Sequence, residues 1–394
     1  MDNGAVQIPS SSIDSLICAV LRGEQPAWTW DCGDAAIQQT MARVDFHGVG
    51  PLLHGRPVPR EWPPQLIDLL WRRALEQTLW ELSHQHLLGE ALASLHAAGI
   101  QPVLFKGTAL AYSIYKEPVR ARGDTDLIVP PEARESAHRL LSALGWRRAV
   151  AVNGEYVSYQ STYTRQAADG ARHCLDLHWK INNSEVLSQL FTHGELLRAA
   201  QPLPALCPHA LGASLVHSLL IACMHRATHL TNPYYVDGVA HCTDMRLIWL
   251  ADIQLLARQL SDEEWNALVS LARDKGLCAI TLDGFARTQE RLGMQVPGFV
   301  QQALAAASRN EAVSTYLSAG KLTQQWMDFR ALKTLDRRLA LMRELLFPHP
   351  DYMRARFPAR SAPLPWLYLL RAFGGAAKRV KFRASPARQM RGPQ

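Results

Sequence analysis

The sequence predicts an α+β fold in which a small mixed sheet with flanking helices lies between two helical regions. Three observations support this prediction. Strand-like apolar runs cluster in residues 100–181, apolar residues elsewhere recur at three- to four-residue spacing, and 48% of the chain is hydrophobic. With only 20% charged residues, the chain has enough apolar side chains for a sizeable core, which excludes disorder throughout.

We expect four regions along the 394 residues. They are an N-terminal helical region (1–98), an α/β core (99–182), a helical domain (183–350) and a basic C-terminal tail (351–394).

The pattern of apolar residues and prolines in the N-terminal region predicts helices separated by turns. Ser12 or Asp14 is the expected N-cap of the first helix, and a second helix is expected from Asp34 to Val44. Prolines make Pro51–Pro64 a connector, and leucines at helical spacing predict a long helix from Pro64 to Ala98.

The core predicts alternating strands and helices. The expected strands are Pro102–Phe105, Asp124–Val129, Trp146–Val152, Tyr156–Thr164 and His173–Ile181. Helices are expected at Thr108–Tyr115 and Glu132–Leu144, and Asn153-Gly154 predicts a tight hairpin turn. The helical domain shows clear apolar periodicity over Leu211–Leu230, Met245–Leu260, Glu263–Lys275 and Leu277–Leu292.

Charge and cysteine usage restrict the class of protein. The net charge is +7, but residues 352–394 hold ten Lys and Arg and no acidic residue, so the rest is near neutral. Seven scattered cysteines without a Cys-x-x-Cys pair indicate reduced thiols and argue against a cysteine-rich zinc site. The first 14 residues lack the basic start of a secretory signal, and no apolar run approaches the ~20 residues of a membrane span. We therefore expect a cytoplasmic protein.

The strongest chemical signal is a set of three aspartates. Asp124 and Asp126 lie two residues apart on a predicted strand, so their side chains share a face. Neighbouring carboxylates repel each other, and a divalent cation such as Mg²⁺ relieves that repulsion. Asp176, in the alternating segment HCLDLHWKI, is the expected third carboxylate.

A second group of residues is suited to phosphate. Lys106, Gly107 and Thr108 lie between a predicted strand and a helix, where a glycine backbone and a helix N-terminus accept an anion. Arg120 and Arg122 could contact phosphates, or could instead pair with Asp124 and Asp126.

These residues resemble a known family. The run GIQPVLFKGTALAYSIYKEPVRARGDTDLIVP is similar to the core of the uncharacterised nucleotidyltransferase family, within the DNA polymerase β superfamily. Lys106-Gly107 stands where that superfamily usually has Gly-Ser, and LDLHWKI matches a later strand and adds His178 and Lys180. HGVGPLL (His47–Leu53) and the stretch around Asp252 extend the likeness over most of the chain.

The resemblance implies a polymerase-β-like sheet and nucleotidyl transfer from an NTP. Asp124, Asp126 and Asp176 would be catalytic and would hold two Mg²⁺ ions, with Asp176 as a metal ligand or as the base for the acceptor hydroxyl. Lys106, Gly107, Thr108, Arg120, Arg122 and Lys180 would bind the nucleotide. The acceptor stays open among small molecules, peptides, proteins and a tRNA end.

Other readings remain beside this one. A descendant that binds nucleotide or a partner without catalysis is one, and nucleic-acid or membrane-surface binding through the basic tail is another. His225 and His229, four apart on a predicted helix near Cys223 and His217, could bind zinc, lie in the core or line an acceptor pocket. Asp252 is expected to pair with His225 or His229.

Overall fold

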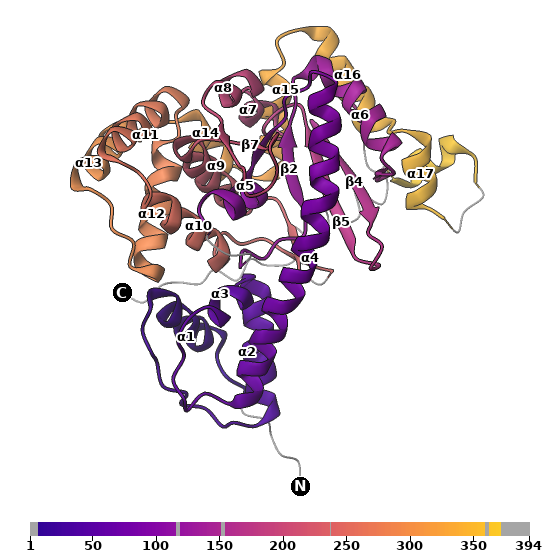
Figure 1. The fold of residues 1–394 in the computed structure, drawn as a ribbon. Helices are drawn as coiled ribbons and strands as arrows, with labels where there is room; N and C mark the ends of the chain where they lie inside the picture. The colour runs from indigo at the N-terminus through magenta and orange to yellow at the C-terminus, as the bar shows by residue number, and fades with distance from the viewer. Residues whose placement is uncertain (1–6, 116–118, 151–153, 237, 359–361, 372–394) are drawn as a thin grey trace.

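The computed structural model describes residues 7–115, 119–150, 154–236, 238–358 and 362–371. It confirms the α+β class: a mixed sheet lies between helices of the N-terminal and C-terminal parts of the chain (Figure 1). None of the helices in these described segments is both long and apolar enough to cross a bilayer.

The sheet has seven strands in the order β3-β4-β5-β2-β1-β7-β6. Their bounds are β1 (Val103–Phe105), β2 (Thr125–Ile128), β3 (Arg147–Arg148), β4 (Gln160–Gln166), β5 (Arg172–His178), β6 (Gln201–Pro202) and β7 (Leu211–Gly212). β2 runs antiparallel to β1 and parallel to β5, so these three strands bring segments that are distant in sequence to the centre of the sheet. A separate two-stranded sheet joins β8 (Tyr234–Val236) and β9 (Val239–His241).

Helices on the N-terminal side include one that crosses the whole molecule. They are α1 (Ser10–Arg22), α2 (Asp34–His47), α3 (Gly50–His54) and α4 (Pro64–Ala97). Leu66 and Leu70, near the start of α4, pack with α1–α3, whereas Leu88 and Leu92 near its end pack against the sheet. One helix therefore joins the N-terminal helices to the sheet, as its course in Figure 1 shows.

The remaining helices flank the sheet and build the C-terminal half. In the core they are α5 (Lys106–Ser113) and α6 (Arg134–Ala143). Beyond it follow α7 (Glu185–Ser188), α8 (His193–Arg198), α9 (Leu215–Thr228), α10 (Leu247–Ala257), α11 (Asp262–Lys275), α12 (Cys278–Leu292), α13 (Gly298–Ala307), α14 (Ala312–Ser318), α15 (Lys321–Ala331), α16 (Leu335–Leu346) and α17 (Pro350–Arg356).

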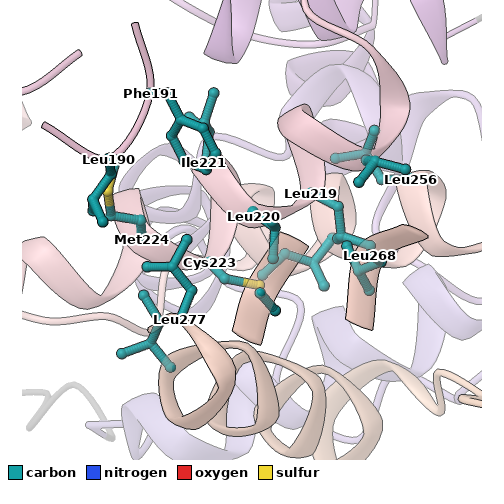
Figure 2. Packing of buried hydrophobic residues seen from close by; sticks show 14 of the residues in the cluster. Leu190, Phe191, Leu219, Leu220, Ile221, Cys223, Met224, Leu256, Leu268 and Leu277 are labelled. Atoms are coloured by element: carbon teal, nitrogen blue, oxygen red, sulfur yellow. The ribbon is translucent and has the colours of Figure 1, made fainter. Parts of the chain in front are cut away.

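The largest apolar cluster forms around α9. Figure 2 shows leucines, Cys223 and Met224 of this helix meeting side chains from α10, α11 and the segments beside them. Val103, Phe105 and Ile128 of the central strands belong to the same cluster. The helical domain and the sheet thus share one core, which holds α9 and α10 beside the ends of β1 and β2.

Three local predictions are wrong. α1 begins at Ser10 after Pro9, so neither Ser12 nor Asp14 caps it; Asp14 instead pairs with Arg43 and His47. Part of the expected connector, Gly50–His54, is helical.

The hairpin predicted around Asn153-Gly154 is also different. β3 ends at Arg148 and pairs through Arg147 with Thr164, which is not the strand register of a two-residue turn at positions 153 and 154; Asn153 itself lies outside the described residues. The observed tight hairpin is between β4 and β5, where the backbone turns over residues 167–171. The division at residues 98, 182 and 350 stays a prediction.

Candidate active site

A cavity of about 1310 Å³ lies where the sheet meets the N-terminal helices and the helical domain. Its sheet side is lined by Lys106, Gly107, Arg120, Arg122, Asp124, Asp126 and Asp176. The opposite side is lined by residues of α9, α10 and β8, and Arg73, Glu76, Gln77 and Trp80 of α4 also contribute. Seven of the predicted site residues therefore line one cavity.

Strand register brings two of the three aspartates together. Asp126 on β2 is the pairing partner of Asp176 on the parallel strand β5. Side chains of paired residues on adjacent strands point to the same side of a sheet, and potential ligand atoms of Asp126, Asp176 and His178 lie within 4.8 Å of one another. Asp124 is not part of this cluster: it precedes β2 and lines the same cavity.

Two cationic or donor groups converge on one oxygen of Asp126. Lys106 Nζ lies 2.7 Å from Asp126 Oδ1, and His178 Nε2 lies 2.9 Å from the same atom. Lys106 sits at the turn from β1 into α5 with φ of 56°, a left-handed conformation that non-glycine residues rarely adopt. This strained turn lies at the cavity wall, and it brings the Lys106 ammonium next to Asp126.

The protonation behaviour of the carboxylates differs sharply. Burial raises the pKa of Asp126, but Lys106 and His178 outweigh it, so the net pKa is well below the ordinary value. Desolvation by the surrounding protein raises the pKa of Asp124 to about 6, with repulsion by Asp126 and Asp176 adding to it, although Asp124 is an exposed residue. Burial, then repulsion by Asp126, also raises the pKa of Asp176.

Asp176 is held by neighbours on β4. Thr162 Oγ1 donates to Asp176 Oδ1 at 2.6 Å, and Gln160 Nε2 donates to Oδ2 at 2.9 Å. These bonds fix the carboxylate plane beside Asp126. Sequence inspection missed both residues, although their alternation on β4 opposite Asp176 is the signal that identifies them.

Arg120 and Arg122 pair with carboxylates, but not with the expected ones. Arg120 makes two hydrogen bonds to Asp252, and Arg122 Nη2 lies 2.5 Å from Glu81 Oε1 on α4. The alternative in which they pair with Asp124 and Asp126 is therefore wrong. Both arginines still line the cavity, and both ion pairs are buried.

Behind the cavity wall, a polar network fixes the start of β2. The buried hydroxyl of Thr108 contacts Thr125 Oγ1 at 2.8 Å and accepts a hydrogen bond from Arg122. His84 Nε2 on α4 lies 2.6 Å from Thr125 Oγ1. Thr108 thus contributes to the scaffold, and His84 and Glu81 are positioning residues that no sequence motif revealed.

Lys180 lies apart from the other predicted nucleotide-binding residues. Its Nζ bonds to Glu185 at 2.8 Å and lies 3.7 Å from the centre of the Tyr159 ring. Lys180 is not among the residues lining the cavity. Its role as a phosphate contact stays a prediction and gains no support from these contacts.

The helical side of the cavity is rich in rings. His229 stacks on Trp249, with ring centres 4.8 Å apart, and its Nε2 lies 3.1 Å from His225 Nε2. Tyr234 packs edge-on against the same tryptophan. Both histidines line the cavity, and their role toward an acceptor stays a prediction.

Within the part of the chain that the structure describes, no third ligand completes a zinc site with His225 and His229. A Cβ at Gly284 of α12 would lie 2.9 Å from Cys223 Sγ, so the thiol is packed against that helix. Asp252 does not pair with either histidine: it binds Arg120 and accepts a hydrogen bond from Tyr115 at 2.8 Å. Among the described residues, the one cluster suited to a metal ion is Asp126, Asp176 and His178.

The donor set fits a hard divalent cation. Mg²⁺ prefers oxygen ligands and typically takes one or two carboxylates together with substrate phosphates and water. No described side chain bonds to Asp126 Oδ2, so that oxygen is free to face an ion although Oδ1 is occupied by Lys106 and His178. Asp126 and Asp176 would thus be able to hold metal at the cavity wall.

One family model and several solved structures are similar to this chain. The family model described as uncharacterised nucleotidyltransferase matches residues 34–293. The antibiotic-resistance factor ANT(2'')-Ia is 17% identical, with 48% of this chain and 91% of that one covered and a TM-score of 0.31. An antigenic nucleotidyltransferase-like protein from Paracoccidioides brasiliensis is 12% identical, with 58% and 97% covered and a TM-score of 0.32.

No curated protein matches the chain. The family match spans the cavity-lining part of the sheet, α4, α9 and α10. The chain belongs to the uncharacterised nucleotidyltransferase family.

Proposed function

We propose that this protein is a Mg²⁺-dependent nucleotidyltransferase that moves a nucleoside monophosphate from an NTP to an acceptor hydroxyl. One observation carries the proposal: Asp126 and Asp176 are register partners on adjacent strands, and they share a large cavity with Asp124 and Lys106. Family membership supports nucleotidyl transfer as the reaction class.

Asp124, Asp126 and Asp176 would hold two Mg²⁺ ions. When bound, these ions neutralise charge on the phosphates and polarise the attacking and leaving oxygens. Asp126 would contribute Oδ2, because its Oδ1 already contacts Lys106 and His178. Thr162 and Gln160 keep the Asp176 carboxylate oriented toward its neighbour, which preorganises the site.

Lys106 and the start of α5 would receive the triphosphate. Gly107 has no side chain between its backbone and the cavity, and the first N–H groups of α5 lie at the positive end of the helix dipole. Lys106 supplies an ammonium at the same point. Arg120 and Arg122 would mainly position the loop before Asp124, since each is held by its own carboxylate.

The reaction itself follows from this placement. The acceptor oxygen attacks the α-phosphorus, the bond from that phosphorus to the bridging oxygen breaks, and pyrophosphate leaves. Asp176 would take the proton of the acceptor hydroxyl, or would serve as a metal ligand. The protein contributes mainly orientation and electrostatic stabilisation, as is general for transfer at phosphorus.

The cavity has room for both substrates. At about 1310 Å³ it exceeds the ~300–1,000 Å³ of ordinary small-molecule pockets. With the triphosphate at the sheet side, the wall of His225, His229 and Trp249 would be left for the nucleobase or the acceptor. A small molecule, a peptide or a protein hydroxyl all suit this arrangement.

The cytoplasmic location we propose rests on the seven unpaired cysteines.

A second candidate is a protein that binds nucleotide without turnover. The ion pair of Lys106 with Asp126 favours it, since an ammonium already neutralises the carboxylate that a metal would bind. Turnover with any acceptor would exclude this candidate.

The test is calorimetric titration of ATP, GTP, CTP and UTP in Mg²⁺ and in EDTA. We expect one nucleotide to bind in Mg²⁺, and binding to be lost in EDTA and in the Asp124→Asn/Asp126→Asn variant. Binding that is indifferent to the metal and to these substitutions would place the nucleotide elsewhere and contradict the proposal. Asp68→Asn, on the exposed surface of α4, is the matched control.

A further inference from the structure

α16 presents an apolar stripe to solvent. Leu335, Leu339, Met342 and Leu346 are spaced by four, three and four residues, which aligns them on one side of a helix. Their exposed fractions are 67%, 58%, 45% and 54%. Only Leu341 of this helix is buried, so the pattern is that of an amphipathic helix with its apolar side facing outward.

The opposite side of α16 is anchored to the sheet region. Glu344 accepts hydrogen bonds from the backbone N–H groups of Glu155, Tyr156 and Val157 at 2.7, 2.9 and 2.9 Å. At 100° per residue, Glu344 lies close to the reverse of the stripe. The outward orientation of the stripe therefore follows from a specific anchor.

The neighbouring helix α15 also carries exposed apolar side chains. On α15, Leu322 and Trp326 are exposed, and Trp326 stacks on Phe329. Arg338 of α16 lies over the Phe329 ring at 5.7 Å, which joins the two helices. Among the described residues, nine of the 18 exposed large hydrophobic side chains belong to residues 322–369. We call these nine the C-terminal apolar face: Leu322, Trp326, Leu335, Leu339, Met342, Leu346, Phe347, Trp366 and Leu369.

The last helical stretch, residues 364–371, is fixed against this surface. Arg371 Nη1 donates to the carbonyl of Leu345 at 2.6 Å, and Tyr368 OH donates to the carbonyl of Pro348 at 2.9 Å. Trp366 on the same stretch stays 54% exposed. This stretch is thus joined to the end of α16, and it carries two further exposed apolar side chains, Trp366 and Leu369.

Positive charge is concentrated in the same part of the chain. Residues 321–394 contain 16 Lys and Arg and four Asp and Glu, whereas residues 1–320 contain 26 and 31. The C-terminal fifth therefore carries a net +12 and the rest a net −5. Exposed leucines and aromatic rings beside a cationic segment are the chemistry of a surface that binds anionic lipid.

We propose that the C-terminal apolar face docks on an anionic membrane surface. The apolar side chains would enter the boundary between headgroups and acyl chains, while lysines and arginines within residues 321–358 and 362–371 bind the lipid phosphates. Charge favours this occupant over a second copy of the chain, because two segments of net +12 repel each other. The proposal is independent of the nucleotidyltransferase activity.

Sedimentation with lipid vesicles tests it on the full chain. We expect binding to vesicles of phosphatidylcholine and phosphatidylglycerol, much weaker binding to phosphatidylcholine alone, and weakening by salt. Leu339→Glu/Met342→Glu should reduce binding by at least about tenfold, since it places two charges in the contact. Phe299→Glu is the matched control, because it alters an exposed ring (44%) on α13, which lies well apart from α16 in Figure 1.

Light scattering and thermal unfolding complete the test. The three proteins should unfold alike, because the altered side chains are exposed. Absence of vesicle binding together with a dimer that Leu339→Glu/Met342→Glu dissociates would replace the membrane by a second copy. Vesicle binding that is unchanged in that variant, or that is equal on neutral lipid, would overturn the proposal.

Discussion

Arg120 donates to both carboxylate oxygens of Asp252, a residue 132 positions later in the chain, at 3.0 and 2.6 Å. Arg120 lies four residues before Asp124, and Asp252 is on α10. The pair therefore links the loop that carries the first aspartate to the helical domain. Both side chains are buried, so the link is shielded from water.

Loss of this pair should destabilise the fold. In Asp252→Asn the Arg120 charge stays buried without its counter-charge, for which we expect a loss of about 3–5 kcal/mol in the free energy of unfolding. Urea unfolding measures it. Asp68→Asn removes the exposed pair with Arg72 and should cost about 0–1 kcal/mol. Equal effects in the two variants would mean that Asp252 does not hold Arg120 in solution.

Asp124 should destabilise the metal-free protein at neutral pH. Its pKa is raised to about 6 from an ordinary 3.8, so the folded state disfavours the charged form and stability falls as pH rises through this interval. With screening by cavity water, Asp124→Asn should gain about 1 kcal/mol above pH 6 in EDTA and nothing below pH 3.8.

In Mg²⁺, wild type should become more stable than Asp124→Asn, which is the reverse of the order expected in EDTA. Wild type gains stability from an ion bound to its carboxylates, and Asp124→Asn gains less. Asp336→Asn, at an exposed position of α16, provides the control for loss of one surface charge. If Asp124→Asn were less stable than wild type in EDTA above pH 6, that result would contradict the raised pKa of Asp124.

Acid should destabilise the fold between pH 6.5 and 4. Burial lowers the pKa of seven histidines: His47, His84, His138, His173, His217, His225 and His229. These rings stay neutral in the fold at a pH where the unfolded chain binds protons, so stability is present above pH 6.5 and is lost on acidification.

One histidine allows the slope to be assigned. The pKa of His138 falls to about 4, first through burial and then through Arg148. Each such ring contributes up to about 1.4 kcal/mol per pH unit, so His138→Asn should flatten the plot of unfolding free energy against pH. His86→Asn, on a side chain that is 75% exposed, should leave the slope unchanged. Stability that is constant or increases toward pH 5 would refute this account.

Lys106 should weaken the binding of metal alone and strengthen the binding of nucleotide. Its ammonium lies on Asp126 Oδ1, so Lys106→Gln should strengthen Mn²⁺ binding in the absence of nucleotide. The same variant should weaken NTP binding by about tenfold or more, because a phosphate contact is lost. Titration calorimetry measures both constants.

Lys180→Gln is the natural comparison for this experiment. Lys180 pairs with Glu185 and does not line the cavity, so both constants should stay near wild type. A loss of NTP affinity in Lys180→Gln that matched the loss in Lys106→Gln would restore the predicted phosphate contact at Lys180.

The sequence predicted the carboxylates but not what holds them. The sequence alone identified Asp124, Asp126 and Asp176, because strand alternation and spacing determine which side chains share a face. Long helices such as α4 and α11 were predicted within a few residues because their apolar period is unambiguous. Strands β6 and β7 have two residues each, too few for any period.

The partners of buried charges depend on tertiary packing. Asp252 was expected to meet His225 or His229, which lie near it on the adjoining helix, yet its partner Arg120 comes from a loop in the other half of the chain. Glu81 and His84 face the site only because α4 packs across the sheet. No local pattern encodes such contacts.

The account depends most on where metal and triphosphate bind. A crystal structure with Mn²⁺ and a non-hydrolysable form of the preferred NTP, with anomalous scattering recorded at the manganese edge, tests this directly. We predict manganese peaks at about 2.0–2.2 Å from carboxylate oxygens of Asp126 and Asp176, with the triphosphate directed toward Lys106 and Gly107. Nucleotide bound away from these aspartates, or manganese at other residues, would contradict the proposed active site.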